Sequence, residues 1–421
     1  MPLSISDAEK RSSISERLHV LGRGNECILN IGRYYAIDGS LGSEVYIDGS
    51  KPHVILICGK RGYGKSYTMG VIMEELYRMD NPVKKNLGVV VIDTLGIYWT
   101  SFFENRKQKN VLERWGLSPS RMKITLLSSA GNMEKYRKIG LPASKFSIKA
   151  SELSAYQWCH LFGVKMVEPL GVAISRAINE LEGKNYSLEE VVECVRNDGS
   201  SSGHVKGACE NFFRMASSWN LFDTEGVAIE DIVRAGEITV IDMSSFSDEL
   251  KKVLVSIMAG KIFERRVIER KEDEEKIIKG RAGEKKKFPL VWMAIDEAQL
   301  FLPREKSISK DILINQWMRQ GRQPGLSLIL ATQRPGALDE EVMSHSDIII
   351  CHRLTSQEDI DALNRVRPTY MKEEMGEALK KVGSEKGVAL IVDDISESVR
   401  IIKVRPRLSW HGGEEACLTA K

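Results

Sequence analysis

The sequence predicts an α/β fold with a doubly wound, mainly parallel sheet. Six short apolar runs rich in Val and Ile recur along the chain, and helix-like stretches separate most of them. Such runs are typical of parallel strands buried on both faces, where the alternation of polar and apolar residues disappears. The first run leads directly into a glycine-rich loop and then a helix, which is a recurrent unit of this fold class.

The expected strands follow one another along the chain. The six runs are Val54–Cys58, a run ending at Asp93, residues 238–243, and runs ending at Asp296, Thr332 and Cys351. Residues 388–394 and 398–404 flank a short polar turn and predict a β-hairpin. Near the start, residues 24–39 and 43–49 also have the composition of strands.

Residues 155–234 differ in character, because several stretches there have helical spacing and strands are absent. Ser187 followed by Glu190 predicts a capping box at the start of one helix. In a second departure, residues 264–288, mixed charge continues a helix that should break at Gly280 and Gly283. The loop Lys285, Lys286 and Lys287 then reads either as solvated surface or as a basic contact loop.

These features divide the chain into four parts. We expect a short N-terminal segment with strands at residues 1–50, a core at 51–154 and 235–405, an all-α insertion at 155–234, and a tail at 406–421 that is too short for a domain.

Composition excludes several classes of protein. The 421 residues hold 61 basic and 58 acidic side chains, so any nucleic-acid binding must come from local arrangement. Seven scattered cysteines without a C-x-x-C pair indicate reduced thiols and a cytoplasmic location. The start of the chain lacks an apolar signal region, and no apolar run approaches the ~20 residues of a membrane helix. We therefore expect neither secretion nor membrane insertion.

The run GKRGYGKS fits the phosphate-loop pattern G-x-x-x-x-G-K-[ST]. Its glycines allow the backbone to approach phosphates, and the following helix directs its dipole and N–H groups at them. Lys65 supplies charge to the β- and γ-phosphates, and Ser66 supplies a hydroxyl to Mg²⁺. The predicted ATP-binding residues are Gly59, Lys60, Arg61, Gly62, Tyr63, Gly64, Lys65, Ser66 and Tyr67.

The acid pair Asp296 and Glu297 follows another buried strand, at the edge where ligands of open α/β sheets bind. We expect Asp296 to be the second Mg²⁺ partner and Glu297 to be the general base of hydrolysis. An adjacent acid pair favours a hydrolase over a kinase, which must keep water from the γ-phosphate.

Three more polar residues are candidates. Gln333 follows the strand ending at Thr332 and would orient water or sense nucleotide if that strand neighbours the phosphate-loop strand; otherwise it bonds only to backbone. Arg319 and Arg322 are either solvated or serve as an arginine finger toward a neighbouring subunit. His160 and His352 each adjoin a cysteine but lack further metal ligands at useful spacing, so we expect core or rim positions.

Five segments together resemble the HerA/FtsK superfamily of DNA-pumping ATPases, in particular HerA-like archaeal proteins, over most of residues 53–404. They are GKRGYGKSYT, VVVIDTLGIYW, ITVIDMSSF, AIDEAQLFLP and RQGRQPGLSLILATQRPGALDEEVMSHSDIIICHRL. The resemblance implies a RecA-like (ASCE) ATPase core, a hexameric ring and ATP-driven movement along double-stranded DNA. It also implies that Arg322 is the arginine finger that reaches the nucleotide of a neighbouring subunit, and that Arg319 is the second candidate for this role.

Two departures from the family pattern matter. HerA proteins carry a β-barrel of about a hundred residues before the core, whereas only about fifty residues precede it here. We expect that barrel to be truncated or absent, which puts docking of a NurA-type nuclease in doubt. The family's Asp-Pro-x-Gly-Glu-Tyr keeps Asp93, Gly96 and Tyr98, but its glutamate is Ile97.

Three functions remain open at this point. The first is a motor that grips the DNA backbone, with residues 104–110 and the lysine loop as candidate channel segments that can equally be solvated surface. The second is a secretion or conjugation ATPase that acts with a membrane partner. The third is an ATP-gated assembly switch, which the intact set of catalytic residues argues against.

Overall fold

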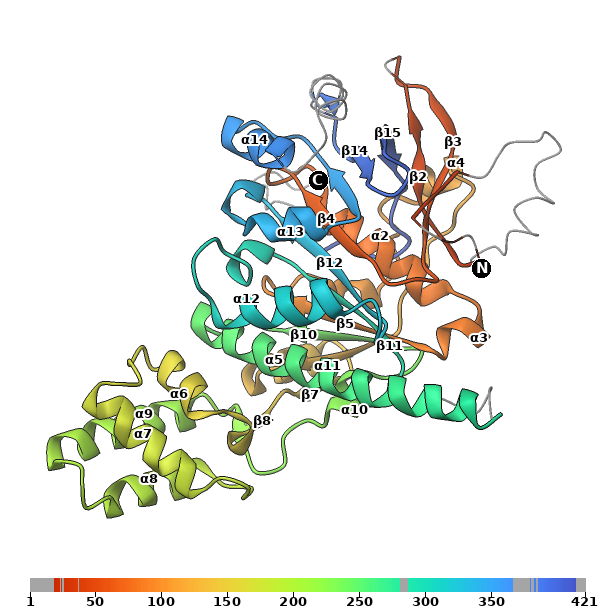
Figure 1. The fold of residues 1–421 in the computed structure, drawn as a ribbon. Coiled ribbons are helices and arrows are strands. Elements are labelled where there is room, and N and C mark those ends of the chain that lie inside the picture. Colours follow the sequence, from red (N-terminus) through yellow and green to blue (C-terminus); the bar gives the residue numbers. More distant parts are fainter. Residues whose placement is uncertain are drawn as a thin grey trace.

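The computed structural model describes residues 19–413, except 23, 25, 37, 281–286, 366–378, 380, 381 and 384. Its centre is a 13-stranded sheet in the order β1-β3-β2-β15-β14-β13-β4-β12-β11-β5-β10-β6-β7. The predicted α/β fold with a mainly parallel sheet is confirmed, and Figure 1 shows helices on both sides of the sheet.

All six predicted core strands are confirmed. They are β4 (Val54–Cys58), β5 (Leu87–Asp93), β10 (Ile238–Asp242), β11 (Leu290–Ile295), β12 (Leu326–Thr332) and β13 (Ile348–Cys351). They pair in parallel with one another, and β6 (Ile124–Ser128) and β7 (Ala143–Lys145) extend the parallel set beyond β10. These last two strands were not predicted, because they are short and lie toward the sheet edge.

The strands are buried on both faces, which explains their continuous apolar runs. In β4, Val54, Leu56 and Cys58 pack into one apolar cluster, whereas Ile55 and Ile57 pack into the other. Two helical layers of different make-up cover these faces.

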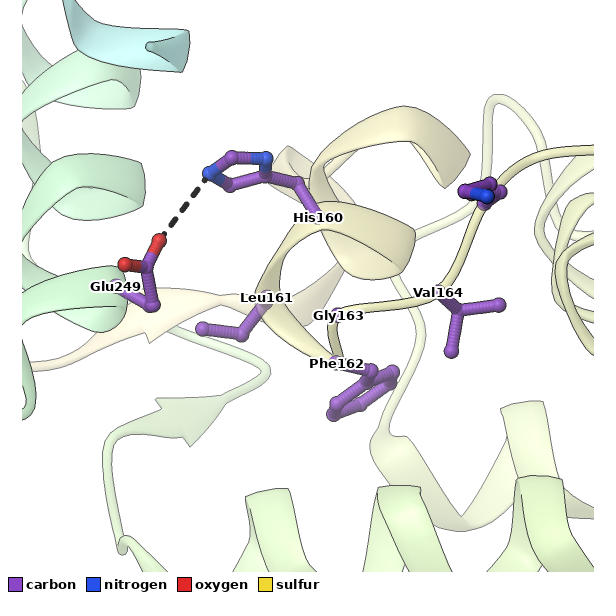
Figure 2. A pocket seen from close by; sticks show the side chains of 7 residues that line it. His160, Leu161, Phe162, Gly163, Val164 and Glu249 are labelled. Carbon is purple, nitrogen blue, oxygen red and sulfur yellow. Dashed lines mark ion pairs between the residues drawn. The ribbon is translucent and has the colours of Figure 1, made fainter.

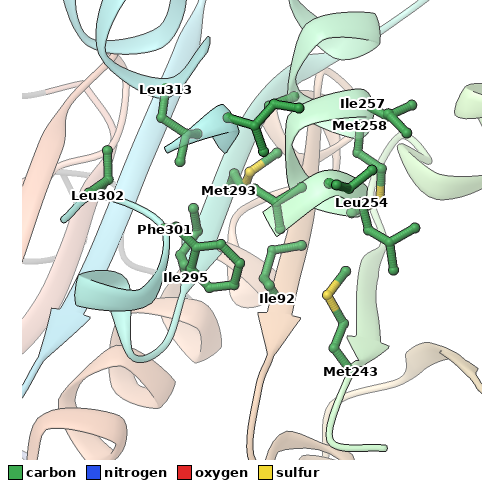
Figure 3. Packing of buried hydrophobic residues seen from close by; sticks show 14 of the residues in the cluster. Ile92, Met243, Leu254, Ile257, Met258, Met293, Ile295, Phe301, Leu302 and Leu313 are labelled. Carbon is green, nitrogen blue, oxygen red and sulfur yellow. The ribbon is translucent and has the colours of Figure 1, made fainter. Parts of the chain in front are cut away.

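The first cluster is covered mainly by α11 (Asp248–Ile278), whose 31 residues make it the longest helix of the described chain. Figure 3 shows Leu254, Ile257 and Met258 of this helix packed against Met293 and Ile295 of β11. Other elements on this side are α10 (Ile229–Ile232), η3 (Ala298–Leu300), α12 (Ile308–Ile312), η4 (Leu313–Met318), η5 (Pro335–Ala337), α13 (Glu340–His345) and α14 (Gln357–Arg365).

The second cluster is covered by α2 (Lys65–Arg78), which starts at the end of the glycine-rich loop. Tyr98 of η1 (Tyr98–Phe102) and Tyr136 of α5 (Ala130–Lys138) belong to the same cluster. The short helices α3 (Asn81–Lys84) and α4 (Lys109–Arg114) complete the connections of this half of the chain.

Helices α6 (Ala155–Leu161), α7 (Pro169–Glu180), α8 (Leu188–Asn197) and α9 (Gly203–Ser218) form a bundle that projects away from the sheet in Figure 1. Its interior is aromatic: the Trp158 ring lies 5.5 Å from Phe162 and 5.2 Å from Phe213. The capping box of Ser187 and Glu190 is confirmed.

A small two-stranded sheet stands where the chain enters and leaves this bundle. There β8 (Ile148–Lys149), which is followed by η2 (Ala150–Glu152), pairs with β9 (Phe222–Asp223). The expectation that residues 155–234 lack strands is therefore wrong at β9, because a two-residue strand formed only by long-range pairing leaves no periodic pattern.

The hairpin of β14 (Val388–Asp393) and β15 (Ser398–Val404) is confirmed and pairs antiparallel with β13. Strand β15 also pairs with β2 (Ile28–Tyr35), and β3 (Leu41–Asp48) and β1 (His19–Leu21) follow. The N-terminal strands therefore continue the main sheet, and the hairpin joins them to the core.

The predicted break after the long helix occurs where α11 ends at Ile278, and Gly280 follows with φ of 71°. Gly283, Lys285 and Lys286 lie outside the described residues. Lys287 is described, and its Nζ lies 3.2 Å from Glu272 Oε2.

The residues after β15 pack tightly against α2, although the sequence suggested only a short tail. Arg405 and Arg407 are each 1% exposed and both pair with Glu74, at 2.9 Å and 3.2 Å. Arg405 also pairs with Glu75 at 2.8 Å. We call residues 405–411 the C-terminal clasp.

Candidate functional site

The glycine-rich loop runs from β4 into α2 with a backbone that only glycine adopts without strain at three points, two of them next to the helix. Gly62 has φ of 81° and Gly64 has φ of 120°. No side chain caps the N-terminus of α2. The first N–H groups of this 14-residue helix therefore point toward the loop without a side-chain partner, as an anion site requires.

Within this loop, Lys65 is 6% exposed and its Nζ lies 3.3 Å from the carbonyl oxygen of Lys60. Burial lowers the pKa of Lys65, and the charges of Asp296 and Glu297 oppose that effect. Lys60 and Arg61 are exposed on the outer side of the loop. The loop thus holds one buried cation next to the acid pair.

The two predicted Mg²⁺ partners lie together, because Ser66 Oγ donates to Asp296 Oδ2 at 3.0 Å. Tyr98 OH lies 3.3 Å from the same carboxylate oxygen. Burial and the charge of Glu297 raise the pKa of Asp296 to about 6, although Ser66 and Lys65 lower it. A hydroxyl and a buried carboxylate suit Mg²⁺, which prefers oxygen ligands and keeps several waters.

Glu297 follows Asp296 in the left-handed region, with φ of 54°. Its carboxylate accepts hydrogen bonds from the Nε2 groups of Gln299 and Gln333. The prediction that the Gln333 strand neighbours the phosphate-loop strand is confirmed, since Thr332 of β12 pairs with Cys58 of β4. The alternative that Gln333 bonds only to backbone is wrong, because its amide contacts Glu297.

Three neighbouring strands each present a buried carboxylate at their carboxyl ends. Asp296 follows β11, while Asp93 and Asp242 end β5 and β10, which pair in register. Asp93 accepts the N–H of Tyr98 at 2.8 Å, and Asp242 accepts the Tyr136 hydroxyl at 2.8 Å. Burial raises the pKa of Asp93 to about 7, and the charges of Asp242 and Asp296 add to the rise.

His352 and Arg353, which follow β13, support the loop from its other side. His352 is fully buried, as expected for a core residue, and its Nε2 lies 2.8 Å from Thr68 Oγ1 of α2. Burial lowers the pKa of His352 to about 4, so the ring is neutral. Arg353 donates to the Tyr63 hydroxyl at 3.1 Å and lies over its ring. No motif marks this support, which depends on the pairing of β13 with β4.

Tyr67 directs its side chain elsewhere. Its hydroxyl accepts the N–H of Arg407 at 2.6 Å and donates to Gln108 Oε1 at 2.8 Å. Its ring lies 5.3 Å from that of His411. The structure thus places this predicted nucleotide-binding side chain against the C-terminal clasp, because long-range hydrogen bonds hold it there.

The two candidate finger residues have different surroundings. Arg319 pairs with Glu341 of its own chain and donates to Asn315 Oδ1 at 3.0 Å. Arg322 is exposed, and no hydrogen bond or ion pair holds it among the residues that the structure describes. It precedes β12, whose seven residues span about 20 Å. Because β12 and β4 are parallel, Arg322 lies at the opposite edge of the sheet from its own phosphate loop.

The candidate channel segment at residues 104–110 lies on the surface. Arg106 has an 83% exposed side chain and pairs with Glu104 at 3.2 Å. Across the described ranges, no group of three or more His, Cys, Asp and Glu side chains could hold a metal ion. No described helix is long and apolar enough to cross a bilayer.

A separate hollow of about 540 Å³ lies where α6 meets α11, and Figure 2 shows its lining. His160 Nε2 lies 3.4 Å from Glu249 Oε2 on one side, so His160 is a rim residue as expected. Its lining includes no residue of the phosphate loop or of the acid pair. The chemistry described above therefore belongs to the loop and not to this hollow.

Known proteins share this sequence pattern. The family described as "Helicase HerA, central domain" matches residues 29–262. The DNA double-strand break repair helicase HerA of Pyrococcus furiosus is 25% identical over 241 residues, which are 54% of this chain and 42% of that protein. A probable DNA double-strand break repair helicase HerA of Methanocaldococcus jannaschii is 23% identical, and the match covers 92% of this chain and 78% of that protein.

Among solved structures, VirB4 of Thermoanaerobacter pseudethanolicus has a similar fold. The TM-score is 0.57 at 14% sequence identity, and the match covers 93% of this chain and 98% of that one. This likeness supports the RecA-like α/β ATPase fold. The chain spans less than half the length of some of its curated relatives, at 42% and 43% in two cases.

Proposed function

This chain belongs to the family of the HerA helicase central domain and is an ATPase, and on that premise we propose a motor that moves along double-stranded DNA. One observation supports the proposal above all. A buried lysine, a hydroxyl next to a carboxylate, and a general-base candidate contacting a glutamine converge on a single phosphate loop. A protein that only bound nucleotide would not need the general base.

In this proposal each side chain has one task. The backbone of Gly59–Ser66 and the charge of Lys65 hold the phosphates, and Ser66 and Asp296 hold Mg²⁺. The bound Mg²⁺ would neutralise charge that develops on the phosphate oxygens. Glu297 takes the proton of the attacking water, and Gln333 orients that water.

We also propose that the site is completed by a second copy of the chain. Arg322 is exposed and unpaired in the described chain, and it lies an estimated 20 Å from its own loop. A neighbour in a ring can receive it, and a closed hexamer is the arrangement that the family resemblance suggests. Arg319 is the weaker candidate, because Glu341 already holds it.

Measured ATP turnover with and without duplex DNA tests the proposed motor. We expect DNA to stimulate turnover, and Glu297→Gln to lower it by about 10²- to 10⁴-fold. Unstimulated turnover would instead favour an ATPase of a secretion or conjugation machine with a membrane partner. Negligible turnover with tight ATP binding would favour an assembly switch.

Electron microscopy with a non-hydrolysable ATP analogue tests the ring. We expect a six-fold ring with a pore near the ~20 Å width of duplex DNA, and a persistent monomer would contradict DNA threading. Mixing Arg322→Ala with Glu297→Gln subunits should restore part of the turnover, because one interface then contains both native residues. A cytoplasmic location, which the scattered cysteines suggest, is also part of the proposal. A NurA-type nuclease partner rests on the resemblance alone, and the short N-terminal segment puts its docking in doubt.

A further inference from the structure

The carboxylate of Glu297 has both oxygens occupied by side-chain amides. Gln333 Nε2 donates to Oε1, and Gln299 Nε2 donates to Oε2 at 2.5 Å. Gln333 follows β12, whereas Gln299 lies in the short η3 helix just after the acid pair. Two donors from different elements fix the plane of the carboxylate, which a single donor would leave free to turn.

A carboxylate only accepts hydrogen bonds, so the NH₂ group of the Gln299 amide faces Glu297. The amide oxygen, Gln299 Oε1, then lies 2.7 Å from Thr332 Oγ1 and accepts its hydroxyl proton. The same hydroxyl oxygen accepts the N–H of Arg334 at 3.1 Å. Thr332 thus gives the amide oxygen a partner and holds the amide in this orientation.

Thr332 is suited to this task because it is fully buried and ends β12. Glu297 itself has a left-handed backbone, a conformation that persists in a non-glycine residue only when surrounding contacts hold it. The end of β12 therefore controls both donors to the carboxylate, Gln333 directly and Gln299 through Thr332.

We propose that Gln299 is a positioning residue for the general base Glu297, and that Thr332 sets the orientation of the Gln299 amide. The inference rests on the proposed role of Glu297. Two donors from different elements hold the carboxylate in one orientation, in which it can accept a proton from water. Gln299 thus aims the base.

Steady-state kinetics of the full chain tests this role. Gln299→Met keeps the length of the side chain and removes the donor. We expect kcat to fall about tenfold while the KM for ATP changes less than about twofold, because the loss affects the transition state and not binding.

Thr332 supplies the matched pair of variants. Thr332→Val removes the hydroxyl at nearly constant shape and should lower kcat by a smaller factor than Gln299→Met does, again with little change in the KM for ATP. Thr332→Ser keeps the hydroxyl and should behave as the native chain does. Binding of a fluorescent ATP analogue should be the same in all of these variants.

Each outcome decides a separate point. An unchanged kcat in Gln299→Met, or a KM for ATP that rises as much as kcat falls, would overturn the positioning role. If Gln299→Met does not fold, a native kcat in Thr332→Val, or an equal loss of kcat in Thr332→Ser, would overturn the proposal instead. Substantial turnover in Glu297→Gln would show that the general base lies elsewhere. That result would contradict the proposed function itself, and it does not depend on the Gln299 or Thr332 variants.

Discussion

Two regions of this protein bury carboxylates, and they treat the charge in opposite ways. In the C-terminal clasp, Glu74 is 1% exposed and contacts both Arg405 and Arg407. At the carboxyl edge of the sheet, Asp93, Asp242 and Asp296 are as deeply buried, and the cation whose charge lowers the pKa of Asp296 is Lys65. In the clasp, arginines of the same chain neutralise the charge of Glu74. At the sheet edge, the carboxylates retain negative charge that a bound cation would neutralise.

The pKa values of the two regions express this difference. Burial alone would raise the pKa of Glu74, but Arg405 and Arg407 outweigh it and hold the pKa below its usual value. At the sheet edge burial prevails, and the pKa values of Asp296 and Asp93 rise to about 6 and about 7. Arginines of the same chain thus keep the buried Glu74 ionised, whereas burial without such partners favours the protonated form of Asp296 and Asp93.

The largest expected effect is on the clasp. Glu74→Gln leaves the buried Arg407 without its carboxylate and Arg405 with Glu75 alone, and we expect the free energy of unfolding to fall by about 3–5 kcal/mol. Urea denaturation measures this loss. Glu113→Gln, at an exposed helix position, is the control and should change stability by less than about 0.5 kcal/mol. A loss below about 1 kcal/mol for Glu74→Gln would show that the clasp does not need its charge.

We expect a smaller effect on the free energy of unfolding at His53. This residue precedes β4, at the end away from the phosphate loop, and lies between Asp347 and Asp48. Burial lowers its pKa, but the two carboxylates outweigh burial and raise the pKa to about 9. The group therefore stabilises the fold fully below about pH 6.5, and this contribution is lost as the pH rises through about 9. We expect His53→Gln to lower stability by on the order of 2 kcal/mol at pH 7, and to match the native chain near pH 10. An equal loss at both pH values would contradict the ion-pair explanation.

The smallest expected effect, of opposite sign, concerns Asp296. Asp296→Asn removes an unneutralised buried charge, and we expect the ligand-free chain to gain about 1 kcal/mol at pH 8. Because the folded pKa of Asp296 is raised, the gain should be present above about pH 6 and should vanish as the pH falls toward about 3.9. Thermal denaturation should also show a reduced stabilisation by MgATP in this variant. A loss of stability in the ligand-free chain at pH 8 would overturn the contrast between the two regions.

Much of the fold could be predicted because its signals are local. The six core strands are continuous apolar runs, and their two-sided burial follows from that composition alone. The loop Gly59–Ser66 and the pair Asp296 and Glu297 were found for the same reason, since each lies at the end of such a run. Strands β1, β6, β7, β8 and β9 were missed because they have only two to five residues each, too few for a clear pattern.

The sequence by itself determined the chemistry of this protein: a phosphate loop, a carboxylate beside a hydroxyl, and a candidate base, each encoded within a few residues. Only the tertiary structure decided how those groups are supported. It joined the N-terminal strands to the sheet through β15, turned Tyr67 toward Arg407, and linked Thr332 through Gln299 to Glu297. Hydrogen bonds and ion pairs between distant residues leave no periodic pattern in a single chain, and they exist only after strand pairing has brought their partners together.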